Sequence, residues 1–251
     1  MKMPINWGKG QQYDTGSSNA VAMDDFGHVV EVHVGSGRLF YHVGTVDFAN
    51  QTIDWGEKEP GQPPYDTGSS NAVALDNEGH VVEVHVGSGR LFYHVGVANF
   101  ANHTIDWGEG QQYDTGSSNA VALWEDSGGA CYTIEVHVGS GRLFYRLGAV
   151  NFDKQMITWG YSQQYDTGDS NAVAIAGSGQ IVEVHVGSDR LFYSYGTPGF
   201  LDLNQRFAQS PSIYYDTGGP NAVAYADNPF RAVEVHVGSG RLFYRVGNFT
   251  S

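Results

Sequence analysis

The chain repeats one alternating pattern of apolar and polar residues five times. In the first copy, Val30-Glu31-Val32-His33-Val34 alternates with a period of two and is rich in β-branched residues, which predicts a β-strand. The glycine-containing turn Gly35-Ser36-Gly37 separates it from the apolar segment Leu39-Phe40-Tyr41-His42-Val43, so the two segments are expected to form a hairpin. Helix-period stretches are absent from the sequence. The pattern therefore predicts an all-β protein.

Two further segments bring each copy to four strands. Asn19-Ala20-Val21-Ala22 is short and has small side chains, as the crowded strand nearest a propeller axis requires. Thr52-Ile53-Asp54-Trp55 is the expected fourth strand, with counterparts at Thr104–Trp107 and Met156–Trp159 and a weaker one around Phe207.

The repeat period predicts the architecture. Tyr-Asp-Thr-Gly recurs about every 50 residues, a period typical of propeller blades, and begins at Tyr13, Tyr65, Tyr113, Tyr165 and Tyr215. We expect residues 1–251 to form a single five-bladed β-propeller of four-stranded antiparallel blades, with repeats starting near residues 9, 57, 109, 161 and 209.

The ends of the sequence indicate how the ring closes. Residues 4–8 include Ile5-Asn6-Trp7-Gly8, which matches the fourth strand, and the sequence stops just after the third strand of the fifth copy. We therefore expect residues 4–8 to complete the last blade and remove its exposed edge. The alternatives are a linear β-solenoid, which would need polar capping repeats, and a larger ring made by two chains.

Two connections keep their sequence in all five copies, and two vary. Tyr-Asp-Thr-Gly joins the fourth strand to the next blade, and His-Val-Gly-Ser-(Gly or Asp)-Arg joins the second strand to the third. Because strands alternate in direction, these two connections emerge on the same side of the ring. We therefore predict a conserved rim that carries ligand-binding residues, with tyrosine or tryptophan as a stacking surface. The candidates are Asp14, Asn19, His33, Arg38, Asp66, Asn71, His85, Arg90, Asp114, Asn119, His137, Arg142, Asp166, Asn171, His185, Arg190, Asp216, Asn221, His236, Arg241, Trp7, Trp55, Trp107 and Trp159.

A structural role for the same residues is the competing interpretation. Aspartate and threonine at a turn bond their own backbone, and serine and asparagine cap strand ends. Glu31 is expected opposite position 42 of the hairpin, where a cross-strand bridge to His42, or to its counterparts His94, Arg146 and Arg245, would explain the acid. The histidines outside the Glu-Val-His motif, His42 and His94 among them, are interpreted as surface residues.

Charge and cysteine content exclude several partners. The net charge is −14, from 27 acidic and 13 basic residues, and would repel nucleic acid and anionic lipid. Cys131 is the only cysteine, so an internal disulfide is excluded. No stretch is long and apolar enough for membrane insertion and none resembles a signal peptide, which favours the cytoplasm or non-classical secretion. A monomer is favoured because the matched ends of the sequence indicate closure within one chain.

Catalytic and metal chemistry are not expected from the motifs. Asp14-Thr15-Gly16 resembles the catalytic loop of pepsin-like proteases, but those need two adjacent aspartates, whereas a fivefold ring holds its aspartates apart. Glu31 and His33 share a strand face, yet five equivalent copies argue against one asymmetric catalytic centre. A zinc site needs three or four converging ligands, and this strand is not the axial one. We therefore expect no enzyme activity, no cofactor and no metal.

Polar groups beside aromatic residues, repeated five times, are typical of a multivalent carbohydrate-binding surface. The five tandem units, with Trp-Gly before four of the five inner strands and a blade shared by the chain ends, resemble tachylectin-2-like five-bladed propeller lectins. The fifth copy departs, since no tryptophan precedes Tyr215. The resemblance implies a lectin that agglutinates cells by binding glycans or glycoconjugates at up to five sites. The alternative is a protein-interaction or toxin-accessory propeller.

Overall fold

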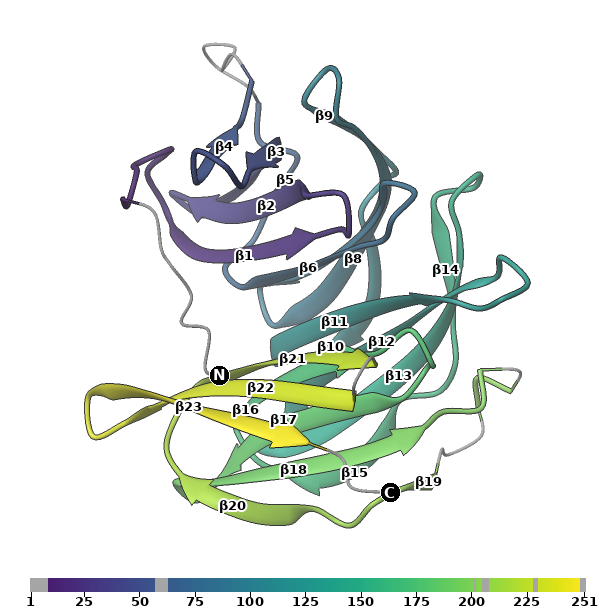
Figure 1. The fold of residues 1–251 in the computed structure, drawn as a ribbon. Coiled ribbons are helices and arrows are strands. Elements are labelled where there is room, and N and C mark those ends of the chain that lie inside the picture. The colour runs from purple at the N-terminus through teal and green to yellow at the C-terminus, as the bar shows by residue number, and fades with distance from the viewer. Residues whose placement is uncertain (1–8, 57–62, 201, 205–207, 228–229, 249–251) are drawn as a thin grey trace.

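Five antiparallel β-sheets form the blades of a ring (Figure 1). The computed structural model describes residues 9–56, 63–200, 202–204, 208–227 and 230–248. These residues form strands and turns, and none of them belongs to a helix that could cross a membrane. The predicted all-β, five-bladed propeller is confirmed.

The first sheet contains β1 (Ser17–Met23), β2 (His28–Gly35), β3 (Arg38–Asp47), β4 (Thr52–Asp54) and β5 (Asp66–Thr67). The second contains β6 (Asn71–Leu75), β7 (His80–Gly87), β8 (Arg90–Asn99), β9 (Thr104–Trp107) and β10 (Gln111–Thr115). The third contains β11 (Ser117–Glu125), β12 (Cys131–Gly139), β13 (Arg142–Asn151), β14 (Met156–Trp159) and β15 (Gln163–Thr167). The fourth contains β16 (Ser170–Ile175), β17 (Ile181–Gly187), β18 (Arg190–Thr197), β19 (Ala208–Gln209) and β20 (Ile213–Thr217). The described part of the fifth contains β21 (Asn221–Asp227), β22 (Phe230–Gly238) and β23 (Arg241–Asn248).

The innermost strand of each blade carries small side chains. Strands β6, β11 and β16 each contact the inner strands of their neighbouring blades. The alanines of the Asn-Ala-Val-Ala motif allow this approach, and Ala74, Ala122 and Ala172 are buried there. The predicted position of this motif nearest the axis is confirmed.

The hairpin between the second and third strands has a two-residue turn. In the first blade Gly35 pairs with Arg38, and the turn residues Ser36 and Gly37 have φ values of 54° and 74°. Positive φ at both positions is the geometry of a type I′ turn, which matches the twist of the flanking strands. Asp189 replaces the glycine in the fourth blade at φ 60°, a conformation that aspartate tolerates better than most residues.

The outermost position of a blade is divided between two short strands. In the second blade, β9 pairs with the last residues of β8, whereas β10, which carries Tyr113 and Asp114, pairs with its first residues. The sequence predicted Tyr-Asp-Thr-Gly to be a connection between blades. Its first residues instead extend the outer edge of the preceding blade, and only then does the chain cross to the next inner strand.

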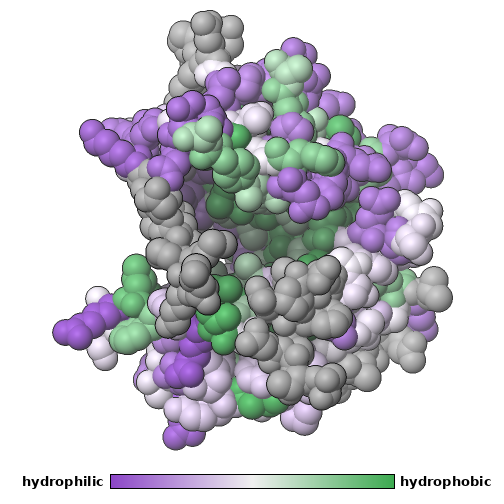
Figure 2. Space-filling model, in the orientation of Figure 1, coloured by the Kyte–Doolittle hydropathy of each residue, from purple (hydrophilic) through white to green (hydrophobic). Residues whose placement is uncertain are grey.

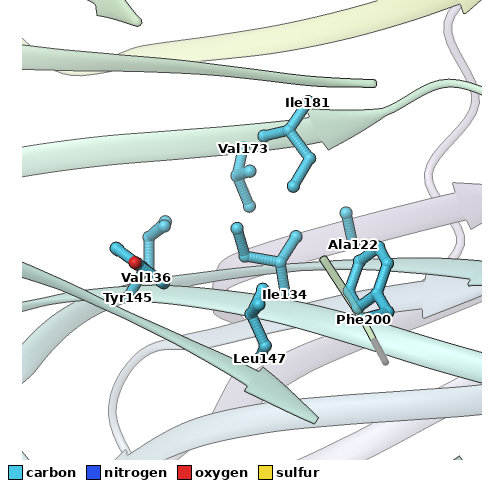
Figure 3. Packing of buried hydrophobic residues seen from close by; sticks show 8 residues of the cluster. All are labelled: Ala122, Ile134, Val136, Tyr145, Leu147, Val173, Ile181 and Phe200. Atoms are coloured by element: carbon cyan, nitrogen blue, oxygen red, sulfur yellow. The ribbon is translucent and has the colours of Figure 1, made fainter. Parts of the chain in front are cut away.

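The hydrophobic core consists of layers between successive blades. Between the third and fourth blades, Ile134, Val136 and Leu147 of one sheet pack with Val173 and Ile181 of the next (Figure 3). Equivalent layers join the first blade to the second and the second to the third. Each blade therefore depends on its neighbour to bury its face.

The seam between the first and fifth blades exposes apolar residues among the described part of the chain. Val21 of β1 is 64% exposed, whereas its counterpart in the second blade, Val73, is 8% exposed because the first blade covers it. Leu242 and Tyr244 of β23 are also exposed. A hollow with apolar side chains inside it is visible in the middle of Figure 2. Residues 4–8, predicted to complete the fifth blade, lie outside the described residues.

Candidate functional site

The two conserved connections meet on one rim, as the sequence predicted. The amide of Gly68, which follows Tyr-Asp-Thr of the second copy, donates to the carbonyl of Gly37 in the hairpin turn of the first blade at 3.2 Å. The same bond joins Gly116 to Gly89 and Gly168 to Gly141, each at 3.1 Å. Each conserved turn thus ties a blade to the segment that leads into the next.

A set of polar side chains that we call the rim cluster recurs beside these turns in every blade. It consists of the glutamate and histidine of the second strand, the aspartate of Tyr-Asp-Thr, and the third-strand residue opposite the glutamate, which we call the variable residue. The five clusters are Glu31, His33, Asp14 and His42; Glu83, His85, Asp66 and His94; Glu135, His137, Asp114 and Arg146; Glu183, His185, Asp166 and Ser194; and Glu234, His236, Asp216 and Arg245.

Glutamate and histidine form a buried pair in each cluster. In the third blade, Nδ1 of His137 lies 2.9 Å from Glu135 and Nε2 lies 3.7 Å from Oδ2 of Asp114. The other four copies have nearly the same distances, and every one of these histidines is less than 5% exposed. Asp114 belongs to the outer edge of the second blade, whereas His137 belongs to the third. The aspartate therefore joins two blades.

The predicted cross-strand bridge from the glutamate is wrong, although its register is correct. Glu135 stands opposite Arg146, but Arg146 donates from Nε to Asp114 at 2.8 Å and from Nη1 to the carbonyl of Gly160 at 2.9 Å. The glutamate binds the histidine two residues along its own strand instead. In the fourth blade the glutamate, Glu183, also accepts a hydrogen bond from Tyr165 at 2.6 Å.

The interpretation of His42 and His94 as surface residues is also wrong. They are 9% and 4% exposed, and Nε2 of each lies within 2.9 Å of its cluster aspartate. The reason is the segment that leads into each blade, because it carries Asp14 or Asp66 and brings that carboxylate against the imidazole.

Burial and charge shift the titration of the third cluster. Burial alone would raise the pKa of Asp114, but the hydrogen bonds from Arg146 and from the Thr115 amide lower it below its ordinary value. Burial alone would lower the pKa of His137, but Glu135 and Asp114 outweigh it, so the net shift is upward. Both shifts favour the charged forms of these two side chains.

A phenylalanine covers the histidine of each cluster. Phe144 stacks on His137 with ring centroids 5.5 Å apart and an interplanar angle of 13°. Gly139 makes this possible, because a Cβ at that position would lie 3.0 Å from the Phe144 ring. The stacked pairs in the other blades are His33 with Phe40, His85 with Phe92, His185 with Phe192, and His236 with Phe243.

A cavity of about 380 Å³ opens at the third cluster. Its lining residues are Asp114, Thr115, His137, Gly139, Ser140, Arg142, Phe144 and Ser162. Charged, hydroxyl and aromatic groups thus converge on one opening at the rim. The predicted aspartate, histidine and arginine all contribute to it.

The predicted asparagines, and those of the predicted tryptophans that the structure describes, do not line this cavity. Asn71, Asn119 and Asn171 are buried on the inner strands. Trp107 stacks on Tyr65 with ring centroids 5.1 Å apart, and Trp159 stacks on Tyr113 at 5.0 Å, so both lie in aromatic contacts with the outer strand of the preceding blade. Trp7 is outside the described residues.

Five of the eight lining residues were not among the predicted site residues: Thr115, Gly139, Ser140, Phe144 and Ser162. Phe144 and Ser140 belong to segments that are repeated in all five copies, so their invariance was the available signal. Ser162 stands where the second blade has Gly110 and carries no such signal.

No protein-family model matches the chain, and no curated protein sequence does. Among solved structures, the chain is similar to a fucose-specific lectin from Aleuria aurantia, with a TM-score of 0.59 and 12% identity over 92% of this chain and 77% of the lectin. An exo-β-1,3-galactanase from Phanerochaete chrysosporium has a TM-score of 0.53 and 6% identity over 96% of this chain and 62% of its own. The catalytic domain of a GH62 α-L-arabinofuranosidase from Coprinopsis cinerea has a TM-score of 0.52 and 12% identity over 94% of this chain and 92% of its own.

These similarities show the propeller fold, and they correct one expectation. The sequence analysis predicted that the protein is not an enzyme, because five equivalent copies argue against one catalytic centre. Glycoside hydrolases are among the solved structures that share the fold, so five similar blades do not exclude an enzyme and that prediction is wrong. A ring of similar blades is compatible with catalysis.

Proposed function

We propose that this protein binds carbohydrate at the rim clusters of its blades. The observation that carries the proposal is the cavity at the third cluster, whose volume of about 380 Å³ lies within the range of roughly 300 to 1,000 Å³ usual for small-molecule sites. The lectin and the two hydrolases are each named for a sugar, which supports a carbohydrate as the ligand.

The groups around the cavity suit a sugar ring. Arg142 and Ser140 are exposed and offer hydrogen-bond donors to hydroxyl groups, and Asp114 offers acceptor oxygens. Phe144 offers an aromatic surface for the C–H side of the ring. Strands hold Asp114, Arg142 and Phe144, and the tight hairpin turn holds Ser140, so little backbone conformational entropy is lost on binding.

Repetition of the cluster supports binding at several sites. The five hairpin turns and their arginines recur around one rim, and a surface that presents matching sugars would gain avidity of roughly 10² to 10⁴ over one site. The copies are not identical. Asp169 and Asp189 replace serine and glycine in the fourth, and Gly219-Pro220 replaces Ser-Ser in the fifth, so these two sites are expected to bind more weakly.

A glycan array followed by calorimetry with the free sugar tests the proposal. Replacing all five hairpin arginines, Arg38, Arg90, Arg142, Arg190 and Arg241, with alanine should abolish binding while leaving the melting temperature nearly unchanged. Lys154→Ala is the matched control, because it removes an exposed positive charge from the opposite rim, which carries the connections that differ between copies. Each glycan that binds is recovered and checked for cleavage, since the fold also occurs in hydrolases.

The expected result is binding of one glycan class by the wild type and by the control, and none by the arginine variant. A protein that binds nothing on a broad array, or an arginine variant that binds as well as the wild type, would contradict the proposal.

A further inference from the structure

The rim clusters of the first two blades differ from the others in having two histidines. In the second blade, Oδ2 of Asp66 lies 2.8 Å from Nε2 of His94 and 3.6 Å from Nε2 of His85. These three atoms lie within 4.8 Å of one another, as do the corresponding atoms of Asp14, His33 and His42. The sequence analysis expected no such convergence, because it did not place the variable residue beside the aspartate.

The hydrogen bonds of the second cluster point the lone pairs of both imidazoles inward. Nδ1 of His85 lies 3.0 Å from Glu83, and Nδ1 of His94 lies 2.9 Å from the carbonyl of Gly108. A carboxylate and a carbonyl only accept, so Nδ1 carries the proton in each ring. In the neutral rings Nε2 is then an acceptor, and it faces the acceptor oxygen of Asp66. A cation placed between these atoms would have all three as ligands.

In the third, fourth and fifth blades a donor contacts the aspartate of the cluster. In the third blade, Arg146 binds both Asp114 and the carbonyl of Gly160, the counterpart of Gly108. Arg245 likewise donates to Asp216 at 2.7 Å in the fifth blade. In the fourth blade the hydroxyl of Ser212 donates to Asp166. Only in the first two blades is the variable residue a metal-ligating side chain.

The geometry suits a transition metal. Ligand atoms about 2.0 to 2.1 Å from a tetrahedral Zn²⁺ stand roughly 3.3 Å apart, and the two distances from Asp66 bracket this value. Two imidazoles and one carboxylate favour zinc and its neighbours over magnesium or calcium, which prefer oxygen ligands. Glu83 holds His85 through its second nitrogen, as outer-shell carboxylates do in metal sites. The Asp66 side chain is 31% exposed, which leaves an approach from solvent.

We propose that the first and second blades each bind one divalent transition-metal ion, with Asp14, His33 and His42 as ligands in the first and Asp66, His85 and His94 in the second. The proposal is independent of carbohydrate binding. The alternative is that one histidine of each cluster carries a second proton and donates a hydrogen bond to the aspartate, with no metal bound.

Zinc titration of the metal-stripped protein, without any affinity tag, distinguishes the two. All variants carry Cys131→Ala, because Asp76, His80 and Cys131 form another group of potential ligands on the opposite rim. Calorimetry gives the affinity, and elemental analysis after gel filtration gives the number of ions per chain. The parent should hold two zinc ions, His94→Arg should hold one, and His42→Arg with His94→Arg should hold none.

Arginine is a suitable replacement because the third and fifth blades carry it at this position, so the variants should fold; circular dichroism and the melting temperature check this. His103→Gln is the matched control, since His103 is a histidine outside the clusters that bonds the carbonyl of Val43, and it should keep both ions. Glu83→Gln should weaken one site about 10- to 100-fold by loosening His85. A parent that binds no zinc at micromolar concentration, or a folded double arginine variant that still binds two ions, would overturn the proposal.

Discussion

Removing the charge of Asp114 tests whether the rim clusters hold neighbouring blades together. Asp114→Asn keeps the size of the side chain but replaces the carboxylate that accepts from Arg146 at 2.8 Å and lies 3.7 Å from His137. The side chains of Asp114 and Arg146 are 19% and 18% exposed. Exposed ion pairs contribute at most about 1 kcal/mol, whereas breaking a fully buried one costs about 3 to 5 kcal/mol. A cost of about 2 kcal/mol is expected for this intermediate burial.

The assay is urea unfolding at pH 7, with Asp153→Asn as the control because Asp153 is an exposed acid of the third blade, which also contains His137 and Arg146. A loss of about 2 kcal/mol corresponds to a fall of roughly 4 to 8 °C in melting temperature for a chain of this size. The pair Arg146→Met and Arg142→Met provides a second comparison, since both lose one positive charge from β13 but only Arg146 binds Asp114. Arg146→Met should cost at least as much more than Arg142→Met as Asp114→Asn costs, because it also removes the hydrogen bond to the Gly160 carbonyl.

The pH dependence follows from the lowered pKa of Asp114. A group whose folded pKa is depressed contributes stability above its unfolded pKa, about 3.9 for aspartate, and loses it as the pH falls through the folded pKa. The gap between wild type and Asp114→Asn should therefore persist at pH 5 and shrink below about pH 4. A cost no greater than that of Asp153→Asn at pH 7 would refute the inference that this aspartate joins two blades.

Three further perturbations have expected outcomes. The pKa of His137 is raised on balance by Glu135 and Asp114, so its stabilising contribution is complete below the ordinary value of about 6.5 and is lost as the pH rises through the folded pKa. The cost of His137→Gln in urea unfolding should therefore be larger at pH 6 than at pH 9. An equal cost at the two pH values would contradict the upward shift. Gly96→Ala should cost about 1 to 3 kcal/mol, since its Cβ would lie 2.7 Å from both Ile105 and Trp107, whereas Gly10→Ala, with no atom within 4 Å of its Cβ, should cost little. Deleting residues 1–8 should lower stability by several kcal/mol if they complete the fifth blade, because Tyr215 would lose a tryptophan contact of the kind that Tyr65 and Tyr113 make. Among the described residues, a cavity of about 510 Å³ is lined by Tyr193 and Tyr215. An unchanged melting temperature would exclude the pairing.

The sequence was sufficient for those features that depend on contacts within one blade. Alternation fixed the faces of β2 and β3, and the turn Ser36-Gly37 fixed their register, so Glu31 was placed opposite His42 correctly. The repeat period and the alternation of strand direction placed both conserved turns on one rim. Each of these inferences needs only local geometry, which side-chain pattern and turn chemistry determine.

Features that depend on two blades could not be predicted in this way. The pattern along β8 shows that His94 shares a face with Phe92, but not that Asp66, which precedes the second blade in the chain, lies across that face. The sequence likewise did not show whether His94 would bond Glu83, which stands opposite it, or Asp66. The packing of one sheet on the next decides such contacts, and periodicity carries no information about it.

The contacts between blades also change how invariance within the chain is interpreted. Gly68 bonds Gly37, Asp114 joins His137 to the preceding blade, and Gly139 admits the Phe144 ring, so invariant residues have a structural duty at each junction. Identical junctions demand identical residues, whether or not a ligand binds there. Differences between copies are therefore the stronger indication of chemistry. The variable residue is histidine, arginine or serine on an otherwise constant frame. An arginine there binds the aspartate as a fixed cation and a histidine contacts it through an imidazole, whereas beside Ser194 the aspartate accepts from Ser212 instead. If the blades have diverged in what they bind, this position is where the divergence lies.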